Sequence, residues 1–300
     1  MLSIVIPYYK LTFFKATLNS LSNQVNKQFK VYIGNDNSPE NPVSLLENYK
    51  DKFDFEYHKF AENVGGISLV QQWERCIALS RDEKWIMILG DDDFLGENVV
   101  EEFYRQLNEV QSVNSNVVRF ATQLVNKDLN NKSKIFQHPK LESPENSFYR
   151  KLKLDSRSSL SEYIFKREVY NQFKFREFPL AWYSDDYAWM HFACNKPIFT
   201  INNAVVFISI SDNSISGSRD NRNKKNRAEI QFFDYLIKNR IQLFNKKQRL
   251  DILYHTELCF LNDGKIKSEQ WTFFWKMYLK YFEIVPFFKF VRRYILSKLN

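Results

Sequence analysis

Short apolar runs alternate with amphipathic segments through the first half of this 300-residue chain. Runs rich in Val, Ile, Phe and Tyr predict strands at 2–7, 29–35, 53–59, 85–89 and 116–124. Apolar residues at helical spacing predict helices between them, at 12–23, 42–49, 67–80 and 97–111. This alternation predicts an α/β fold with a mostly parallel central sheet flanked by helices. In such sheets, ligands bind in the crevice beyond the carboxyl ends of the strands.

The pattern is different after residue 124. The segment 125–147 is polar and weakly periodic, which predicts a mobile loop at the rim of the crevice. Residues 182–187 open a predicted helix that runs to about Cys194, and 197–210 predict a pair of strands. Residues 220–300 are helical in pattern.

Charge divides the chain where this last helical pattern begins. Residues 220–300 carry 17 Lys and Arg against 8 Asp and Glu, whereas the first 219 residues carry 26 against 27. A shift of this kind indicates a domain boundary. We therefore expect an α/β domain over residues 1–218 and a helical, basic and aromatic C-terminal region over residues 219–300.

Composition narrows the class of protein. With 44% hydrophobic and 26% charged residues, the chain is expected to fold around a core of its own. Its cysteines, Cys76, Cys194 and Cys259, have neither disulfide nor metal-site spacing, which fits a reducing cytosol. The N-terminus lacks the basic segment of a signal peptide, and no apolar run reaches transmembrane length. We therefore expect a cytoplasmic protein.

Three consecutive aspartates, Asp91, Asp92 and Asp93, follow the predicted strand at 85–89. Adjacent carboxylates repel one another, and a divalent cation removes that repulsion. Their hard oxygens suit Mg²⁺ or Mn²⁺ bound together with substrate phosphates. The alternative is an Asp-rich turn that caps the helix beginning near Glu97.

The ends of the other predicted strands also carry polar or aromatic residues. Asp36 can accept a hydrogen bond from a nucleotide base, and Tyr8 or Tyr9 offers a ring on which the base can stack. Asn63 begins a loop whose two glycines let the backbone approach a ligand closely. Ordinary turns, and a core position for one tyrosine, are the alternatives.

Asp185 and Asp186 stand at the predicted start of a helix. One of them can cap the helix, where a negative charge is favourable. The other can act as a general base that takes a proton from an attacking hydroxyl. The four histidines are scattered without ligand spacing, and no Ser/His/Asp or Cys/His arrangement stands out in the sequence.

Taken in order, these motifs resemble those of inverting family 2 glycosyltransferases with the GT-A nucleotide-sugar fold. The resemblance covers residues 1 to about 218 and is carried by the segments Ile4–Lys10, Asn35–Ser38, Asn63–Gly65, Leu89–Asp93, Ser184–Tyr187 and Ser214–Ser216. Two positions depart from the family pattern. Gly90 stands where many members carry an acid, and Ser211 stands where a histidine is often found, which leaves a third metal ligand open; Asp212 lies nearby.

The resemblance implies a donor site at the strand ends. Its residues would be Pro7, Tyr8, Tyr9, Asp36, Asn63 and Asp91. Pro7, Tyr8 and Asp36 would hold the base, with Asp36 favouring uracil. Asp91 would contact the ribose or the donor sugar.

The same resemblance implies the catalytic groups. Asp92 would bind the metal that bridges the diphosphate, and Asp93, assigned with it to the metal site, would order that site. Asp186 would be the catalytic base, with Asp185 as its neighbour. The cation would be Mn²⁺ or Mg²⁺.

The C-terminal region combines positive charge with many aromatic residues, most densely over 271–300. Basic and aromatic helices suit an anionic membrane surface, where rings lie at the depth of the headgroups. A helical cap that covers the sheet is the alternative. Nucleic-acid binding is a less favoured interpretation, because the positive charge is confined to this region and the sequence contains no DNA- or RNA-binding motif.

The favoured function is transfer of a hexosyl or N-acetylhexosaminyl group from a UDP-sugar to a saccharide acceptor. By family analogy, the acceptor would be lipid-linked, at the inner face of the plasma membrane, in bacterial O-antigen, capsule or exopolysaccharide synthesis. A sugar-nucleotide pyrophosphorylase is an alternative, but Tyr8–Leu11 lacks the glycine-rich phosphate loop that it requires. A non-enzymatic nucleotide- or nucleic-acid-binding protein is the other alternative.

Overall fold

The computed structural model describes the chain except for residues 127–131, 211–220, 263–265 and 300. The chain forms two compact units, Met1–Glu177 with Ser184–Ser218 and Phe178–Tyr183 with Arg219–Asn300. The second unit therefore includes a short segment that the charge pattern assigned to the first. Its aromatic rings account for this, since Tyr183 stacks on Phe232 with ring centroids 4.7 Å apart.

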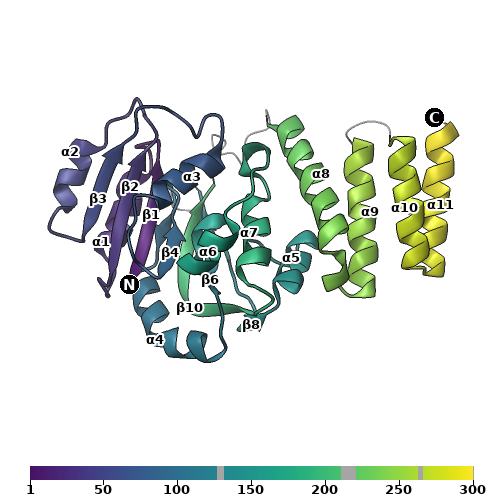
Figure 1. Ribbon diagram of the computed structural model, residues 1–300. Helices are drawn as coiled ribbons and strands as arrows, with labels where there is room; N and C mark the ends of the chain where they lie inside the picture. The colour runs from purple at the N-terminus through teal and green to yellow at the C-terminus, as the bar shows by residue number, and fades with distance from the viewer. Residues whose placement is uncertain (127–131, 211–220, 263–265, 300) are drawn as a thin grey trace. The chain divides into compact units, whose positions relative to one another are not determined.

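The described residues of the first unit contain one ten-stranded sheet (Figure 1). The strand order is β3-β2-β1-β4-β9-β6-β10-β5, with β7 beside β6 and β8 beside β10. The strands are β1 (Leu2–Tyr8), β2 (Phe29–Asn35), β3 (Phe55–Lys59), β4 (Trp85–Ile88), β5 (Phe94–Leu95), β6 (Val117–Val125), β7 (Lys132–Phe136), β8 (Leu141–Glu142), β9 (Tyr163–Lys166) and β10 (Ile198–Ser209).

The expected α/β fold is confirmed, and its central sheet has a parallel core with antiparallel strands added to it. β1, β2, β3 and β4 pair in parallel, and β6 and β10 also pair in parallel. β9 lies between β4 and β6 and runs against both, so that β6 and β10 share the direction of the first four strands. The carboxyl ends of these six strands consequently meet at one edge of the sheet, where β4 leads into the aspartates.

Helices cover both faces of the sheet (Figure 1). Side chains of β1 alternate between the faces, and Leu2, Ile4 and Ile6 join a core cluster with α1 and α4. α3, α6 and α7 cover the opposite face. The helices of the first unit are α1 (Phe14–Ser22), α2 (Val43–Leu46), α3 (Leu69–Ile77), α4 (Val99–Ser112), α5 (Pro144–Leu152), α6 (Arg167–Phe173) and α7 (Ser184–Phe192).

Aromatic rings fill much of the layer between the sheet and α6 and α7. Phe165 of β9 contacts Tyr170, Phe175, Trp189 and Phe192, with ring centroids 5.2–6.3 Å apart. Offset and edge-on contacts of this kind add to the free energy gained by burying the rings. Part of the high aromatic content of the chain is therefore core.

The segment 125–147 was expected as a mobile loop, but its described residues after the end of β6 include two strands and the beginning of a helix. β7 pairs with β6, and β8 pairs with β10. α5 begins at Pro144, and the Ser143 hydroxyl caps it by accepting a hydrogen bond from the amide of Asn146. The expectation was wrong because β7 is a largely exposed edge strand, and such strands carry polar and charged residues in place of an apolar pattern.

The segment 197–210 forms one strand, β10, and not the expected pair. Its register against β6 shifts between Ile201 and Val205, so the residues between them bulge. Asn202 lies in this bulge, where its side chain donates to the carbonyl of His138 and accepts from the amide of the same residue. These two hydrogen bonds stabilise the bulge, and the chain continues in the same direction after it, so β10 remains one strand.

The second unit has the helical pattern that the sequence predicts. In its described part, each long helix packs against the next (Figure 1). They are α8 (Arg222–Asn239), α9 (Lys246–Asn262), α10 (Ser268–Lys280) and α11 (Ile284–Leu299). Among the described residues, no helix combines the length and the apolarity needed to span a membrane.

Many aromatic residues of the second unit lie in its interior. Trp271, Phe274 and Tyr278 of α10 are buried, and Phe290 of α11 stacks on Tyr278 with ring centroids 4.4 Å apart. The expectation that aromatic rings lie at the depth of lipid headgroups is wrong for these four, because they are buried between the helices and join them to each other.

Candidate active site

The turn after β4 carries Asp91, Asp92 and Asp93 at the carboxyl edge of the sheet. Asp91 links this turn to the end of β1, because its Oδ2 accepts hydrogen bonds from the amides of Tyr9 and Lys10 at 2.7 and 2.8 Å. The ends of two adjacent parallel strands are thereby fixed at one point.

Asp93 is buried and stabilises the turn through hydrogen bonds to other segments. Its Oδ2 accepts a hydrogen bond from the Ser161 hydroxyl at 2.5 Å, and its Oδ1 accepts one from the amide of Ser209 at 2.9 Å. Ser161 in turn accepts from the amide of Gly90 at 3.0 Å. With both carboxylate oxygens engaged, Asp93 fits the role of ordering the site better than that of a metal ligand.

Asp92 differs from its neighbours. Within the described part of the chain, its carboxylate has no hydrogen bond or ion pair to another residue, and the side chain is half-buried. Burial, together with the charge of Asp92, raises the pKa of both Asp91 and Asp93 to about 7. Because a divalent cation would favour the ionised carboxylates, these residues fit a metal site in which Asp92 is the protein ligand.

The presence of Gly90, where many family members carry an acid, has a steric basis. A Cβ at this position would lie 3.0 Å from both Asp92 Oδ1 and Asp93 Oδ2. The glycine therefore gives the two carboxylates room that a larger side chain would take. The other departure, at Ser211, lies outside the described residues, as do Asp212 and the segment Ser214–Ser216.

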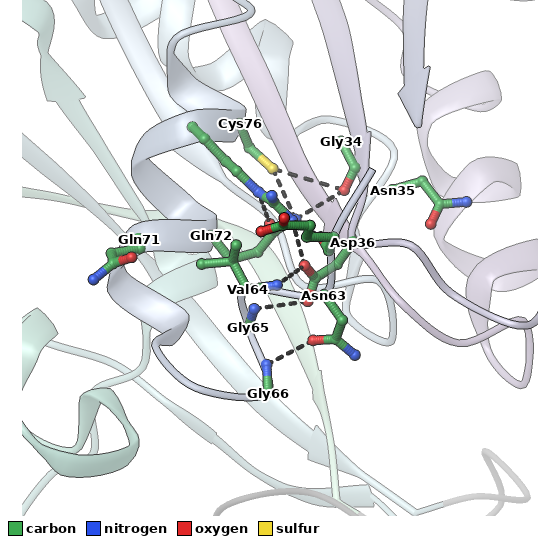
Figure 2. Close-up of polar contacts among 12 residues, drawn as sticks. Gly34, Asn35, Asp36, Asn63, Val64, Gly65, Gly66, Gln71, Gln72 and Cys76 are labelled. Carbon is green, nitrogen blue, oxygen red and sulfur yellow. Dashed lines mark hydrogen bonds and ion pairs between the residues drawn. The ribbon is translucent and has the colours of Figure 1, made fainter. Parts of the chain in front are cut away.

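Asp36 follows β2 and fixes the loop that contains Asn63 (Figure 2). Its Oδ1 accepts from the amide of Val64 at 2.8 Å, and its Oδ2 accepts from the amide of Gly65 at 2.9 Å. A Cβ at Gly65 would lie 2.5 Å from Asp36 Oδ2, so the close approach requires glycine. Asn63 Oδ1 closes the same loop by accepting from the amide of Gly66 at 2.7 Å.

Arg75 of α3 completes this arrangement, although its place on the polar face of a helix gave no sequence signal for it. Its guanidinium forms an ion pair with Asp36 and donates to the carbonyl of Glu62 at 2.8 Å. The same group lies over the Phe60 ring, 3.9 Å from the centroid. Asp36 is buried, and its carboxylate is paired with the Arg75 guanidinium, so direct contact of this carboxylate with a base requires access beside Arg75.

The two tyrosines at the end of β1 have different environments. Tyr8 is 0% exposed, packs on Phe14 with ring centroids 4.6 Å apart, and donates to the carbonyl of Glu40 at 2.9 Å. The expectation that Tyr8 holds the base is wrong for its ring, because this ring belongs to the core. Tyr9 is 37% exposed and is the tyrosine with an accessible ring. Pro7 is half-buried on β1, opposite Gly34 of β2.

Asp186 lies in the first turn of α7 and is buried, whereas Asp185 beside it is half-buried. Lys151 of α5 donates to Asp186 Oδ2 at 2.6 Å. Burial raises the pKa of Asp186 to about 6 despite the opposing effect of the Lys151 charge. A carboxyl group with this pKa can accept a proton at neutral pH.

The short 3₁₀ helix η2 (Leu160–Glu162) connects the two groups of aspartates. Ser161 binds Asp93, and the buried carboxylate of Glu162 acts electrostatically on Asp186. Glu162 is itself held by Arg157 at 2.9 Å. The structure therefore brings the proposed metal site and the proposed base to one region of the first unit, through residues that the sequence analysis did not identify.

Comparison with known proteins places this chain in a family. The profile of "Glycosyl transferase family 2" matches residues 3–189, more than half of the chain. The chain therefore belongs to glycosyl transferase family 2, and the expectation of a glycosyltransferase is confirmed. No significant match was found among curated proteins.

Solved structures show the same fold. S. aureus TarS 1-349 in complex with UDP-GlcNAc matches with a TM-score of 0.64 and 13% identity, over 93% of this chain and 80% of that one. The mannosyltransferase PcManGT from Pyrobaculum calidifontis in complex with GDP-Man and Mn²⁺ matches with a TM-score of 0.55 and 11% identity, over 79% of this chain and 64% of that one. The first unit has the GT-A fold, as the sequence predicted.

Proposed function

We propose that this family 2 member is an inverting, metal-dependent glycosyltransferase that moves a sugar from a UDP-sugar to a hydroxyl of a saccharide acceptor. The observation that carries the proposal is the presence of two carboxylates in environments that η2 connects. The carboxylate of Asp92 has no hydrogen-bond or ion-pair partner among the described residues, and Asp186 is buried with a raised pKa. Family membership favours this activity over a pyrophosphorylase or a non-enzymatic nucleotide-binding protein.

The donor would bind at the carboxyl ends of β1, β2 and β4. Tyr9 offers a ring for the base beside Pro7, and Asp36 shapes the base site by holding the Asn63 loop and Arg75. Asp91 would contact the ribose or the donor sugar. The complex of TarS 1-349 with UDP-GlcNAc supports a UDP-sugar, in which case a hexosyl or N-acetylhexosaminyl group is transferred.

Asp92 would hold a divalent cation, Mn²⁺ or Mg²⁺, which supplies positive charge beside the departing diphosphate. The complex of PcManGT with GDP-Man and Mn²⁺ supports a cation of this kind. Asp186 would take the proton of the acceptor hydroxyl, and Lys151 would keep that carboxylate ionised and oriented. The acceptor oxygen then bonds to the anomeric carbon as the bond to UDP breaks on the opposite face, which inverts the configuration.

The acceptor would be a lipid-linked saccharide in the synthesis of a bacterial surface polysaccharide, with the enzyme on the inner face of the plasma membrane. α11 supports membrane contact through an exposed apolar stripe. Its members recur at helical spacing and are Val285, Phe288, Ile295, Leu296 and Leu299. Exposed Lys289 and Arg292 lie on the same face, which suits anionic lipid headgroups.

Calorimetric titration of UDP, with and without Mn²⁺, tests the donor site. We expect binding to the wild type to require Mn²⁺ and to weaken at least about tenfold in Asp92→Asn. Asp82→Asn, on the exposed turn before β4, is the matched control and keeps wild-type affinity. UDP binding that is equally strong without metal, or in Asp92→Asn, would contradict the proposed site.

A further inference from the structure

The second unit contains three different metal-binding side chains close together, and the proposed transfer reaction uses none of them. Glu229 lies on α8, and His255 and Cys259 lie on α9. One ligand atom from each lies within 4.8 Å of the other two. His255 and Cys259 are four residues apart, so both project from one face of α9 toward α8.

Glu229 is the centre of this cluster. Its Oε1 lies 2.9 Å from His255 Nε2, and the Cys259 thiol also hydrogen-bonds to Glu229. Cys259 is buried, whereas the side chains of Glu229 and His255 are 24% and 33% exposed. The cluster is therefore closed on the thiol side and open to solvent on the other.

The surroundings hold the ligand side chains in place. Tyr183 donates from its hydroxyl to Glu229 Oε1 at 3.0 Å, which fixes the orientation of the carboxylate. The Phe233 ring lies against His255, with ring centroids 4.6 Å apart. An oriented carboxylate beside an apolar wall is the kind of setting in which a bound metal ion is held rigidly.

We propose that Glu229, His255 and Cys259 form a second metal site, for one Zn²⁺ ion with a fourth position taken by water. Thiolate sulfur, imidazole nitrogen and carboxylate oxygen are the donors that Zn²⁺ uses, whereas Mg²⁺ and Mn²⁺ prefer oxygen alone. On binding, the thiol releases its proton to solvent, and the contact between His255 and Glu229 is replaced by two bonds to the metal. The ion joins α8 to α9 and is structural.

Titration of the full chain with Co²⁺ tests this site, because Co²⁺ reports thiolate coordination by its absorption. We expect a thiolate-to-Co²⁺ charge-transfer band that saturates at about one equivalent and disappears when Zn²⁺ is added. Zn²⁺ should also raise the melting temperature. Cys259→Ser should abolish the band, and His255→Gln should weaken Co²⁺ binding at least about tenfold.

Two control variants separate this site from the aspartates. Cys194→Ser, which removes a half-buried cysteine of the other unit, should keep the band. Asp92→Asn should keep it as well, so the outcome does not depend on the proposed transferase activity. A folded wild type without the band, or a band that persists in Cys259→Ser, would overturn the proposal.

Discussion

Asp186 is subject to two opposing influences that set its ionisation. Burial raises its pKa, and the Lys151 ammonium at 2.6 Å lowers it, which leaves the pKa at about 6. Asp185 and Glu162 add negative charge nearby and also raise it. A general base acts in its ionised form, so we expect kcat to rise through about pH 6 and to be level above it.

Replacing Lys151 tests the ion pair. Lys151→Met removes the charge that lowers the pKa of Asp186, so the acid limb of the pH profile should move to higher pH by about one unit or more. The profile of kcat against pH, measured as UDP release from the donor, checks this shift. Lys153→Met, an exposed lysine two residues away, should leave the limb in place. An unshifted profile in Lys151→Met would contradict the assigned role.

Replacing Asp186 tests the base. Asp186→Asn preserves size but cannot accept the proton, and we expect kcat to fall about 10²–10⁴-fold. Calorimetric binding of UDP with Mn²⁺ should stay unchanged, since the donor site lies at other residues. Asp155→Asn, an exposed position, is the control and should keep wild-type kcat. Full activity of Asp186→Asn would exclude it as the base.

At the scale of elements, a buried ion pair joins α9 to α11. Glu257 is 0% exposed, and Arg293 Nε and Nη2 donate to its two oxygens at 2.6 and 2.7 Å. Tyr278 of α10 also donates to Glu257, at 3.3 Å. One carboxylate therefore holds three helices.

Removing the arginine should destabilise the second unit strongly. Arg293→Met leaves the Glu257 charge buried without its partner, and breaking such a pair costs about 3–5 kcal/mol. Urea unfolding followed by circular dichroism measures the loss. The neighbouring Arg292→Met is exposed on α11 and should change the free energy of unfolding by no more than about 0.5 kcal/mol. Equal stability of the two variants would show that the pair contributes little.

At the scale of the whole molecule, the exposed stripe on α11 predicts binding to anionic membranes. Wild type should co-sediment with vesicles that contain anionic lipid and not with purely zwitterionic ones, and high salt should weaken the binding. Phe288→Ser with Ile295→Ser should reduce it, because both side chains are exposed on the stripe. Leu154→Ser, at a position that is 91% exposed on the first unit, should not. A wild type that does not bind anionic vesicles would contradict this prediction. The stripe would then be a surface for another partner, such as a second copy of the chain.

Local sequence patterns predict the parallel core of the sheet, most of the helices that flank it and the order of the motifs at the strand ends. Strands and helices follow from local periodicity, and β2 has the bounds that its apolar run predicts. The closeness of the motifs in space also follows from the sequence, because the carboxyl ends of parallel strands lie at the same edge of a sheet. The sequence did not predict the bulge in β10 or the strand β7. The residues of both lack an apolar pattern, and their backbone conformation depends on hydrogen bonds to other segments.

Which side chains meet in the site depends on how the elements pack against one another. Arg75 reaches Asp36 across 39 residues, Lys151 reaches Asp186 across 35, and Ser161 reaches Asp93 across 68. The packing also decides that Tyr8 lies in the core while Tyr9 remains accessible. Such contacts carry no local pattern, because the partners are set by how the elements pack. The burial that this packing produces raises the pKa of Asp91, Asp93 and Asp186.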